Sequence, residues 1–148
     1  MSTGTSSVMV GNYMRPDETS EGPWRRWMRF AKADLVEAKR LPPPDGLYEL
    51  LCYHAQQAAE KSIKAVLVRR RIEFPYTHDL KKLVKLLPSD IPRPEEIADA
   101  TILTDYAVTT RYPGEEEPLT EEDYREAVRL AEAVVGWAAG YLGYDDAV

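Results

Sequence analysis

The residues best suited to chemistry in this chain lie between Cys52 and Leu67, a stretch whose apolar periodicity predicts a helix. At 100° per residue, its small and apolar side chains gather on one side. The opposite arc is polar and consists of Tyr53, Gln56, Gln57, Glu60, Lys61 and Lys64, with His54 at its border. Outer faces of helices usually carry interchangeable Glu and Lys, whereas adjacent glutamines beside a histidine and a tyrosine indicate particular hydrogen bonds. We expect this face to be open to a ligand or a partner.

Other polar residues are candidates to meet this face. Asp34 lies at the edge of an apolar stripe in the preceding helix, where its carboxylate needs a cation such as Lys61 or Arg111. The alternative is a purely structural ion pair. His78 and Asp79 open a later helix, where Asp79 suits the positive end of the helix dipole, and helix capping is the simpler role of this pair. Arg111 ends another helix and either reaches the face or caps that helix.

Helices must position all of these residues, because strand patterns are essentially absent. Apolar periodicity and proline-rich links predict helices over residues 23–40, 47–71, 78–87, 94–109 and 121–142. Thr77 is the expected N-cap of the third helix. We expect one domain over residues 22–143, preceded by a flexible tail over 1–21 and followed by a short tail over 144–148. Its predicted fold is all-α, an antiparallel up-and-down bundle of four to five helices.

The last helix has the clearest local signals in the chain. Thr120 is its predicted N-cap, and Asp123 stands three residues later, as in a capping box. Gly136 and Gly140 each lower helix propensity by about 1 kcal/mol relative to alanine. We expect close packing of another helix to explain these two glycines.

The net charge of −6 conceals a division between two parts of the chain. Residues 22–87 carry 14 Lys and Arg against 7 Asp and Glu, whereas residues 88–148 carry 4 against 15. Nucleic-acid phosphates need a positive field, so any such binding has to be local to the basic part. The two parts would also suit head-to-tail or dimeric packing. A third explanation is that the charges only solvate the helices.

The composition disfavours several classes of protein. No apolar run approaches the ~20 residues that cross a bilayer, so no membrane partner is expected. Residues 1–21 lack the basic-then-apolar order of a secretory signal. The single cysteine, Cys52, excludes an intramolecular disulfide and falls on the apolar side of its helix. We therefore expect a cytoplasmic protein with an inert, buried thiol.

Common motifs for cofactors, metals and nucleophiles are missing from the sequence. It has no glycine-rich phosphate loop, no pair of histidines around a glutamate and no nucleophile elbow. Two histidines are too few for a usual zinc site. The acidic run at residues 115–117 is typical of a solvated loop. We expect neither a metal nor a cofactor.

Three segments, taken in order, resemble the HEPN domain family: the run from His54 to Ala65, then His78-Asp79-Leu80, then Arg111-Tyr112-Pro113. The resemblance covers about residues 22–143. It implies an α-helical up-and-down bundle, usually dimeric, of the kind found in prokaryotic toxin–antitoxin and defence systems. It further implies a minimal nucleotidyltransferase as a frequent partner, and nucleotide binding or RNA cleavage as activities. A DNA ligand is not expected.

The residues after Arg111 depart from the catalytic members of that family. Ribonuclease-type HEPN domains carry an arginine, four to six residues and then a histidine near the start of the last helix. The histidine can act as a general base while the arginine stabilises phosphate charge. Here residues 112–119 contain no histidine and three glutamates, which would repel RNA. Arg71 and His78 have the formal spacing, but they lie at the junction of the second and third helices.

Three functions therefore compete. The first is a non-catalytic HEPN module that binds a nucleotide, RNA or a partner nucleotidyltransferase in a toxin–antitoxin or defence-like pair. Its ligand-binding residues would be Tyr53, His54, Gln57, Lys61, Lys64 and Arg111, supported by Asp34, Glu60, Asp79 and Tyr112. The second is a ribonuclease toxin that uses Arg71 and His78. The third is a structural homodimer subunit whose polar arc forms the interface. The sequence favours the first, without the ribonuclease motif.

Overall fold

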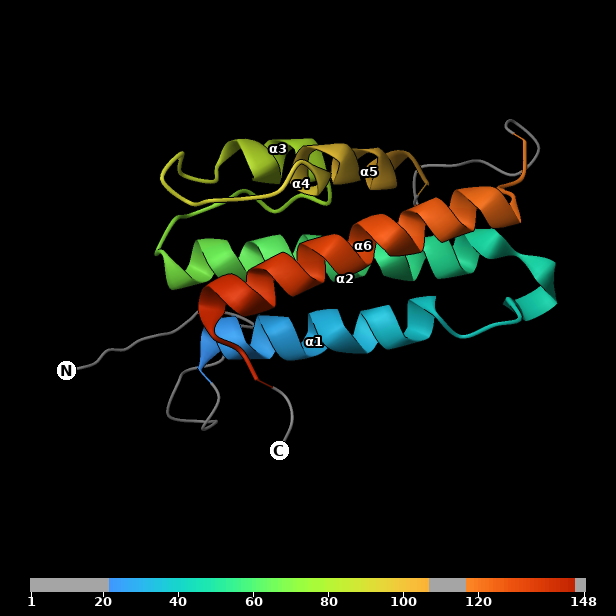
Figure 1. Ribbon diagram of the computed structural model, residues 1–148, viewed down its shortest axis with the longest axis horizontal. Helices are drawn as coiled ribbons and strands as arrows, with labels where there is room; N and C mark the ends of the chain where they lie inside the picture. Colours follow the sequence, from blue (N-terminus) through green and yellow to red (C-terminus); the bar gives the residue numbers. More distant parts are fainter. Residues whose placement is uncertain (1–21, 107–116, 146–148) are drawn as a thin grey trace.

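The computed structural model describes residues 22–106 and 117–145, and every regular element within these ranges is helical (Figure 1). Three long helices form the body: α1 (Pro23–Ala38), α2 (Tyr48–Arg69) and α6 (Glu121–Leu142). Three short helices form a further layer: α3 (Leu80–Lys85), α4 (Glu96–Asp99) and α5 (Leu103–Tyr106). Two 3-10 turns, η2 (Pro44–Gly46) and η3 (Ala100–Ile102), complete the elements. The predicted all-α class is confirmed.

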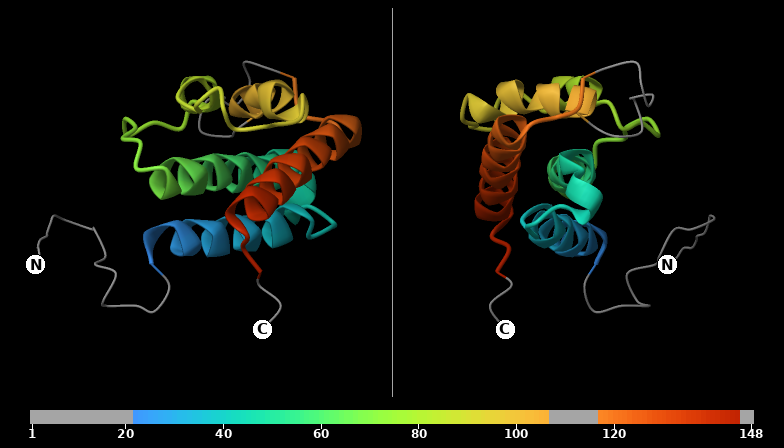
Figure 2. Two further views of the ribbon diagram at one scale, coloured as in Figure 1. Left: turned by 60° about the vertical axis from the view of Figure 1, so that its left-hand side comes forward. Right: turned by 90° about the vertical axis from the view of Figure 1, so that its right-hand side faces the viewer.

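Helix α2 lies at the centre of the fold. Helix α1 runs antiparallel to it on one side, and the short helices lie on the opposite side (Figure 1). Helix α6 crosses α2 and packs against it (Figure 2). The chain therefore follows an up-and-down path whose third leg is divided among α3, α4 and α5. This path brings polar residues to α2 from two sides, from α1 and from the loop before α3.

Local sequence signals account for both ends of α6. The predicted capping box is confirmed: Thr120 Oγ1 accepts from the backbone N–H of Asp123 at 3.1 Å. In return, Asp123 Oδ2 accepts from the backbone N–H of Thr120 at 3.0 Å. Gly143 ends the helix at φ 67°, a left-handed conformation that suits glycine.

Helix α3 begins later in the chain than predicted. Asp79 is its N-cap, because Asp79 Oδ1 accepts from the backbone N–H of Lys81 at 3.0 Å. Thr77, the predicted N-cap, instead accepts from the backbone N–H of Asp79 through Oγ1 at 3.0 Å. Each of these two side chains accepts from the backbone N–H two residues later, but only Asp79 stands directly before the helix. The predicted helix over 78–87 was therefore too long.

The single helix predicted over residues 94–109 is wrong. Helix α4, turn η3 and helix α5 follow one another there, and a tighter 3-10 turn separates the two short helices. Within this stretch, Thr101 Oγ1 donates to the carbonyl of Ala98 at 2.9 Å. Side-chain bonds of this kind compete with the regular helical ladder. Residues 107–109 lie outside the described residues.

Helix α2 is buried around most of its circumference. Its apolar side packs in the core, and Cys52 is buried as predicted. Gln56, Gln57, Glu60 and Lys64 on the polar arc are buried as well. The expectation that this arc is open to a ligand is therefore wrong for these four residues. Neighbouring segments cover the arc, which the periodicity of α2 alone could not reveal.

Gly136 and Gly140 do not mark a close contact between helices. Both are exposed on α6, and a Cβ atom placed at either position would meet nothing within 4 Å. The predicted close packing on these glycines is therefore wrong within this chain.

Candidate functional site

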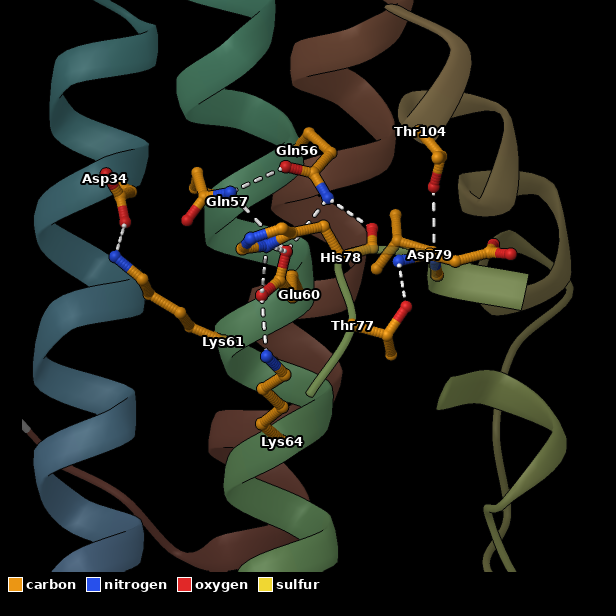
Figure 3. A network of polar contacts seen from close by, with 11 residues as sticks. Asp34, Gln56, Gln57, Glu60, Lys61, Lys64, Thr77, His78, Asp79 and Thr104 are labelled. Carbon is orange, nitrogen blue, oxygen red and sulfur yellow. Dashed lines mark hydrogen bonds and ion pairs between the residues drawn. The ribbon is translucent and has the colours of Figure 1, made fainter. Parts of the chain in front are cut away.

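The carboxylate of Glu60 is the centre of a buried polar network on α2 (Figure 3). Its Oε1 accepts from Gln56 Nε2 at 3.0 Å, and its Oε2 accepts from Lys64 Nζ at 2.8 Å. Nδ1 of His78 lies 3.0 Å from Oε1, and Gln57 Nε2 adds a longer contact of 3.4 Å. A buried carboxylate is costly unless its charge is paired and its oxygens are bonded. The cation and amide donors around Glu60 meet both needs.

The two adjacent glutamines complete this network. Gln56 Nε2 also donates to the backbone carbonyl of His78 at 2.9 Å, and Gln56 Oε1 accepts from Gln57 Nε2 at 2.9 Å. Gln56 therefore ties α2 to the loop before α3. The sequence predicted particular hydrogen bonds for these glutamines, and the partners lie within the chain itself.

A second cluster lies between α1 and α2 and reaches the surface. Asp34 Oδ2 accepts from Lys61 Nζ at 2.6 Å, so Lys61, one of the two partners predicted for this carboxylate, is bonded to it. The other predicted partner, Arg111, lies outside the described residues. Asp34 Oδ1 lies 3.0 Å from Nδ1 of His54. The side chains of Lys61 and His54 remain 23% and 35% exposed. One carboxylate thus holds an ammonium group and an imidazole beside each other at the surface.

Both histidines of the chain are held in the same way. An ionised carboxylate only accepts hydrogen bonds, so Nδ1 of His54 and Nδ1 of His78 carry the proton in these contacts. Each ring keeps Nε2 for another partner, as an acceptor when neutral and a donor when charged. The side chain of His78 is 62% exposed, although Glu60, which holds it, is buried.

An exposed aromatic ring lies next to Lys61. Nζ of Lys61 is 5.8 Å from the ring centre of Phe30 on α1. The guanidinium carbons of Arg26 and Arg29 lie 4.7 and 5.4 Å from the same centre. Phe30 as a residue is 38% exposed. Three cations therefore surround one accessible ring, at distances typical of cation–π contacts.

Lys64 makes a similar contact in the interior. Its Nζ lies 5.4 Å from the ring centre of Trp27 and 5.5 Å from that of Phe74, and the two rings meet edge to face. Burial leaves neither Lys64 nor Gln57 in a position to touch a ligand. We therefore assign these two predicted ligand-binding residues a supporting place behind the surface.

The other predicted residues lie apart from the two clusters or beside them. Tyr53 is half-buried, and its ring stands edge-on to His54 with centroids 5.5 Å apart. Arg71 is exposed just after α2, and within the described ranges its guanidinium forms no bond or ion pair with His78. Arg111 and Tyr112 lie outside the described residues.

Phe30, Arg26 and Arg29 were not predicted as site residues. Their spacing carried a signal, because Arg26 and Phe30 stand four residues apart and so share a face of α1. What the sequence could not show is that Lys61 from α2 approaches the same ring.

The chain is similar to known proteins of one family. A family model described as "HEPN domain" matches residues 24–141, which is most of the chain. The chain belongs to the HEPN domain family. The resemblance inferred from the three short segments is thereby confirmed.

Two solved structures resemble this HEPN domain. The crystal structure of TT1696 from Thermus thermophilus has a TM-score of 0.68 and 30% sequence identity, covering 79% of this chain and 96% of that chain. The crystal structure of ST0689, described as an archaeal HEPN homologue, has a TM-score of 0.65 and 31% identity, covering 82% and 98%. No curated protein matches the chain.

Two further findings concern the described part of this HEPN domain. None of its helices is long and apolar enough to pass through a membrane. Within the same ranges, no three His, Cys, Asp or Glu side chains are grouped so as to hold a metal ion.

Proposed function

We propose that this HEPN domain binds the phosphate and base of a nucleotide or RNA at the surface formed by His54, Lys61 and Phe30, without cleaving its ligand. The observation that carries the proposal is the shared carboxylate of Asp34. It holds Lys61 Nζ and His54 Nδ1 at once, so an ammonium group and an imidazole whose Nε2 donates when the ring is protonated stand together for a phosphate. Because the carboxylate fixes both side chains in advance, binding loses less side-chain entropy.

The base has a partner at the same place. The Phe30 ring is accessible beside Lys61, and aromatic rings bind nucleic-acid bases by stacking. The positive charge of Arg26 and Arg29 beside this ring favours the anionic part of the ligand. A phosphate-binding pair next to a stacking ring is the combination that a nucleotide requires.

Calorimetric titration with ATP, GTP, CTP and UTP, each alone, tests this proposal. The wild-type protein should bind at least one of them, and Lys61→Ala should weaken binding by about 2 kcal/mol, or roughly 30-fold. Lys82→Ala, which removes an exposed lysine of α3, is the matched control and should bind as wild type. Adding Arg111→Ala to Lys61→Ala should abolish binding while the helical circular dichroism stays intact. No binding by wild type, or equal binding by the Lys61 variant, overturns the proposal.

The proposal includes a homodimer and a minimal nucleotidyltransferase partner in a toxin–antitoxin or defence-like pair, as the family resemblance implies. The polar arc of α2 is less suitable as a dimer interface than the sequence suggested. Gln56 and Gln57 are bonded inside the chain, so these amides are not offered to a second copy. Co-purification with the product of a neighbouring nucleotidyltransferase gene, and sedimentation of the chain as a dimer, would support these assignments.

RNA cleavage is the second candidate, and one observation favours it. His78 is exposed while Glu60 holds its Nδ1, and a carboxylate-held imidazole is the arrangement that a general base uses. If this function is correct, expression should arrest growth, and His78→Ala should relieve the arrest. Uncleaved RNA after incubation with the wild-type protein would exclude it.

A further inference from the structure

We propose that residues 8–14, near the N-terminus of the chain, dock on the outward face of the second half of α6. This uncharged face consists of Ala133, Gly136, Trp137, Gly140 and Tyr141. None of these residues belongs to the surface proposed for the nucleotide, so the two proposals stand independently of each other.

Helical spacing brings the uncharged face together. Its members follow the i, i+3, i+4, i+7, i+8 pattern, so they lie on one side of α6. All of them are exposed or partly exposed, and none carries a charge. The solvent side of a surface helix normally carries charged or polar residues, and an exposed apolar patch is typical of an interaction site. This face therefore suits a partner better than it suits water.

The first half of α6 continues the same stripe with charged residues. Glu122, Arg125, Glu126 and Arg129 occupy the equivalent positions, and all four are exposed. Arg129 forms an ion pair with Glu126 at 2.8 Å, and Arg125 pairs with the adjacent Glu121. One helix thus presents a solvated half and an uncharged half on the same side, so the loss of charge is specific to the second half.

The two rings of the uncharged face offer apolar surface, because their polar atoms are bonded within the chain. Trp137 Nε1 donates to the carbonyl of Pro92 at 2.8 Å, and the Tyr141 hydroxyl accepts from Arg70 at 3.0 Å. The rings stack with centroids 6.5 Å apart, and Tyr141 is 38% exposed. Aliphatic and thioether side chains pack well on such rings.

The segment before the described residues has the matching composition. Residues 1–14 contain no charged side chain, and the apolar and aromatic residues of 8–14 are Val8, Met9, Val10, Tyr13 and Met14. Burial of apolar area stabilises such a contact, whereas a charged segment would have to lose water without a partner of opposite charge. An uncharged apolar segment is therefore the occupant that this face fits.

The same segment enters the fold beside the uncharged face. Helix α1 begins at Pro23, and the ring of Trp24 stands edge-on to that of Tyr144, just beyond the end of α6, with centroids 6.5 Å apart (Figure 1). Residues 15–21 can span up to roughly 23–25 Å when extended. From Gly136 to Leu142 the helix rises only about 9 Å. Residues 8–14 can therefore reach the whole face.

Paramagnetic broadening in NMR spectra tests this placement in the full chain. A nitroxide is attached at Asn12→Cys, and because Cys52 is buried, the reagent reaches only the new thiol. The backbone amide signals of Gly136 and Gly140 should disappear or weaken strongly. The signal of Gly46, in the turn η2 that follows the other end of α1, should remain. Reduction of the nitroxide should restore the two lost signals.

Substitutions in the segment test whether its apolar side chains make the contact. Val8→Ser, Met9→Ser and Val10→Ser together should restore both glycine signals in the nitroxide-bearing chain. The matched control changes three polar residues of the same segment and should leave both signals broadened: Thr3→Ala, Thr5→Ala and Ser6→Ala together.

A charge on the face tests the other side of the contact. Gly140→Glu should restore the signal of Gly136, because the docked segment would have to cover a carboxylate. Gly140→Ala is the matched control and should leave that signal broadened. A Cβ atom at this position meets nothing within 4 Å, so both variants should keep the helical circular dichroism of wild type.

A mixture of chains separates the N-terminal segment from a second copy as the occupant. Isotope-labelled chains without nitroxide, mixed with nitroxide-bearing chains, should keep the signals of Gly136 and Gly140. Equal broadening in the mixture would make a second copy the occupant and overturn the inference. Unchanged glycine signals in the nitroxide-bearing chain, or broadening that the three serine substitutions do not relieve, would overturn it as well.

Discussion

Nδ1 of His78 lies 3.0 Å from Oε1 of Glu60, although the histidine side chain is 62% exposed and the glutamate side chain only 3%. This contact joins the surface of the molecule to the charged interior of α2. It explains how α2 can be buried and still carry polar side chains, because buried Glu60 holds the exposed ring of His78 in place.

Replacement of Glu60 by glutamine should destabilise the fold. Lys64 would lose its partner in a buried place, and breaking a buried ion pair typically costs about 3–5 kcal/mol. Urea denaturation measures the loss in the free energy of unfolding. The control is Glu121→Gln on the exposed face of α6, which removes an ion pair with Arg125 and should cost less than about 1 kcal/mol.

The double variant Glu60→Gln, Lys64→Met should be more stable than Glu60→Gln alone. It removes both buried charges, so no unpaired ammonium group remains, and replacing a whole buried pair is often neutral or favourable. The same urea series measures it. If the losses in unfolding free energy of Glu60→Gln alone and Lys64→Met alone add up to the loss of the double variant, the two residues do not stabilise each other.

Gly136→Ala should stabilise the protein by roughly 0.5–1 kcal/mol. Alanine has the higher helix propensity, and its Cβ atom would enter open space on α6. Gly143→Ala is the matched comparison: Gly143 adopts φ 67°, so alanine there should destabilise the end of the same helix. Thermal unfolding of the two variants checks the opposite signs, and a loss of stability in Gly136→Ala would indicate that another chain packs on this face.

Stability should decrease in alkaline solution partly because of Tyr124. Burial, above all, raises the pKa of its hydroxyl, so the folded protein holds this proton more tightly than the unfolded chain does. The resulting stabilisation is complete below the ordinary tyrosine pKa of about 10 and is lost as the pH rises through the folded pKa. Urea denaturation at about pH 8 and about pH 10.5 should show a smaller decrease for Tyr124→Phe than for wild type. Tyr76→Phe, with its fully exposed ring, should follow wild type; parallel curves for all three proteins would contradict the account.

Local signals in the sequence were enough for the helical class and for much of the helix pattern. The capping box of Thr120 and Asp123 and the apolar periodicity of α1, α2 and α6 act within a few residues, so the sequence reports them directly. The third leg was harder to predict, because short helices depend on the core against which they pack.

The candidate site was predictable only in part, because it depends on contacts between distant segments. The pairing of Asp34 with Lys61 was foreseen from a carboxylate that needed a partner. The burial of Gln57 and Lys64 was not, since the periodicity of one helix cannot show that α1 and the loop before α3 cover its polar side. The ring of Phe30 was missed for the same reason.

The central claim is that ligand binds where Asp34 holds His54 and Lys61, and NMR of the histidine rings tests it most directly. The chain has two histidines, so a spectrum of the ring nitrogens contains two sets of signals, which His78→Gln assigns. During titration with the nucleoside triphosphate that binds, the signals of His54 should shift until saturation, and in Lys61→Ala the same shift should need a ligand concentration roughly 30-fold higher. Saturation of binding without any movement of the His54 signals would contradict the account.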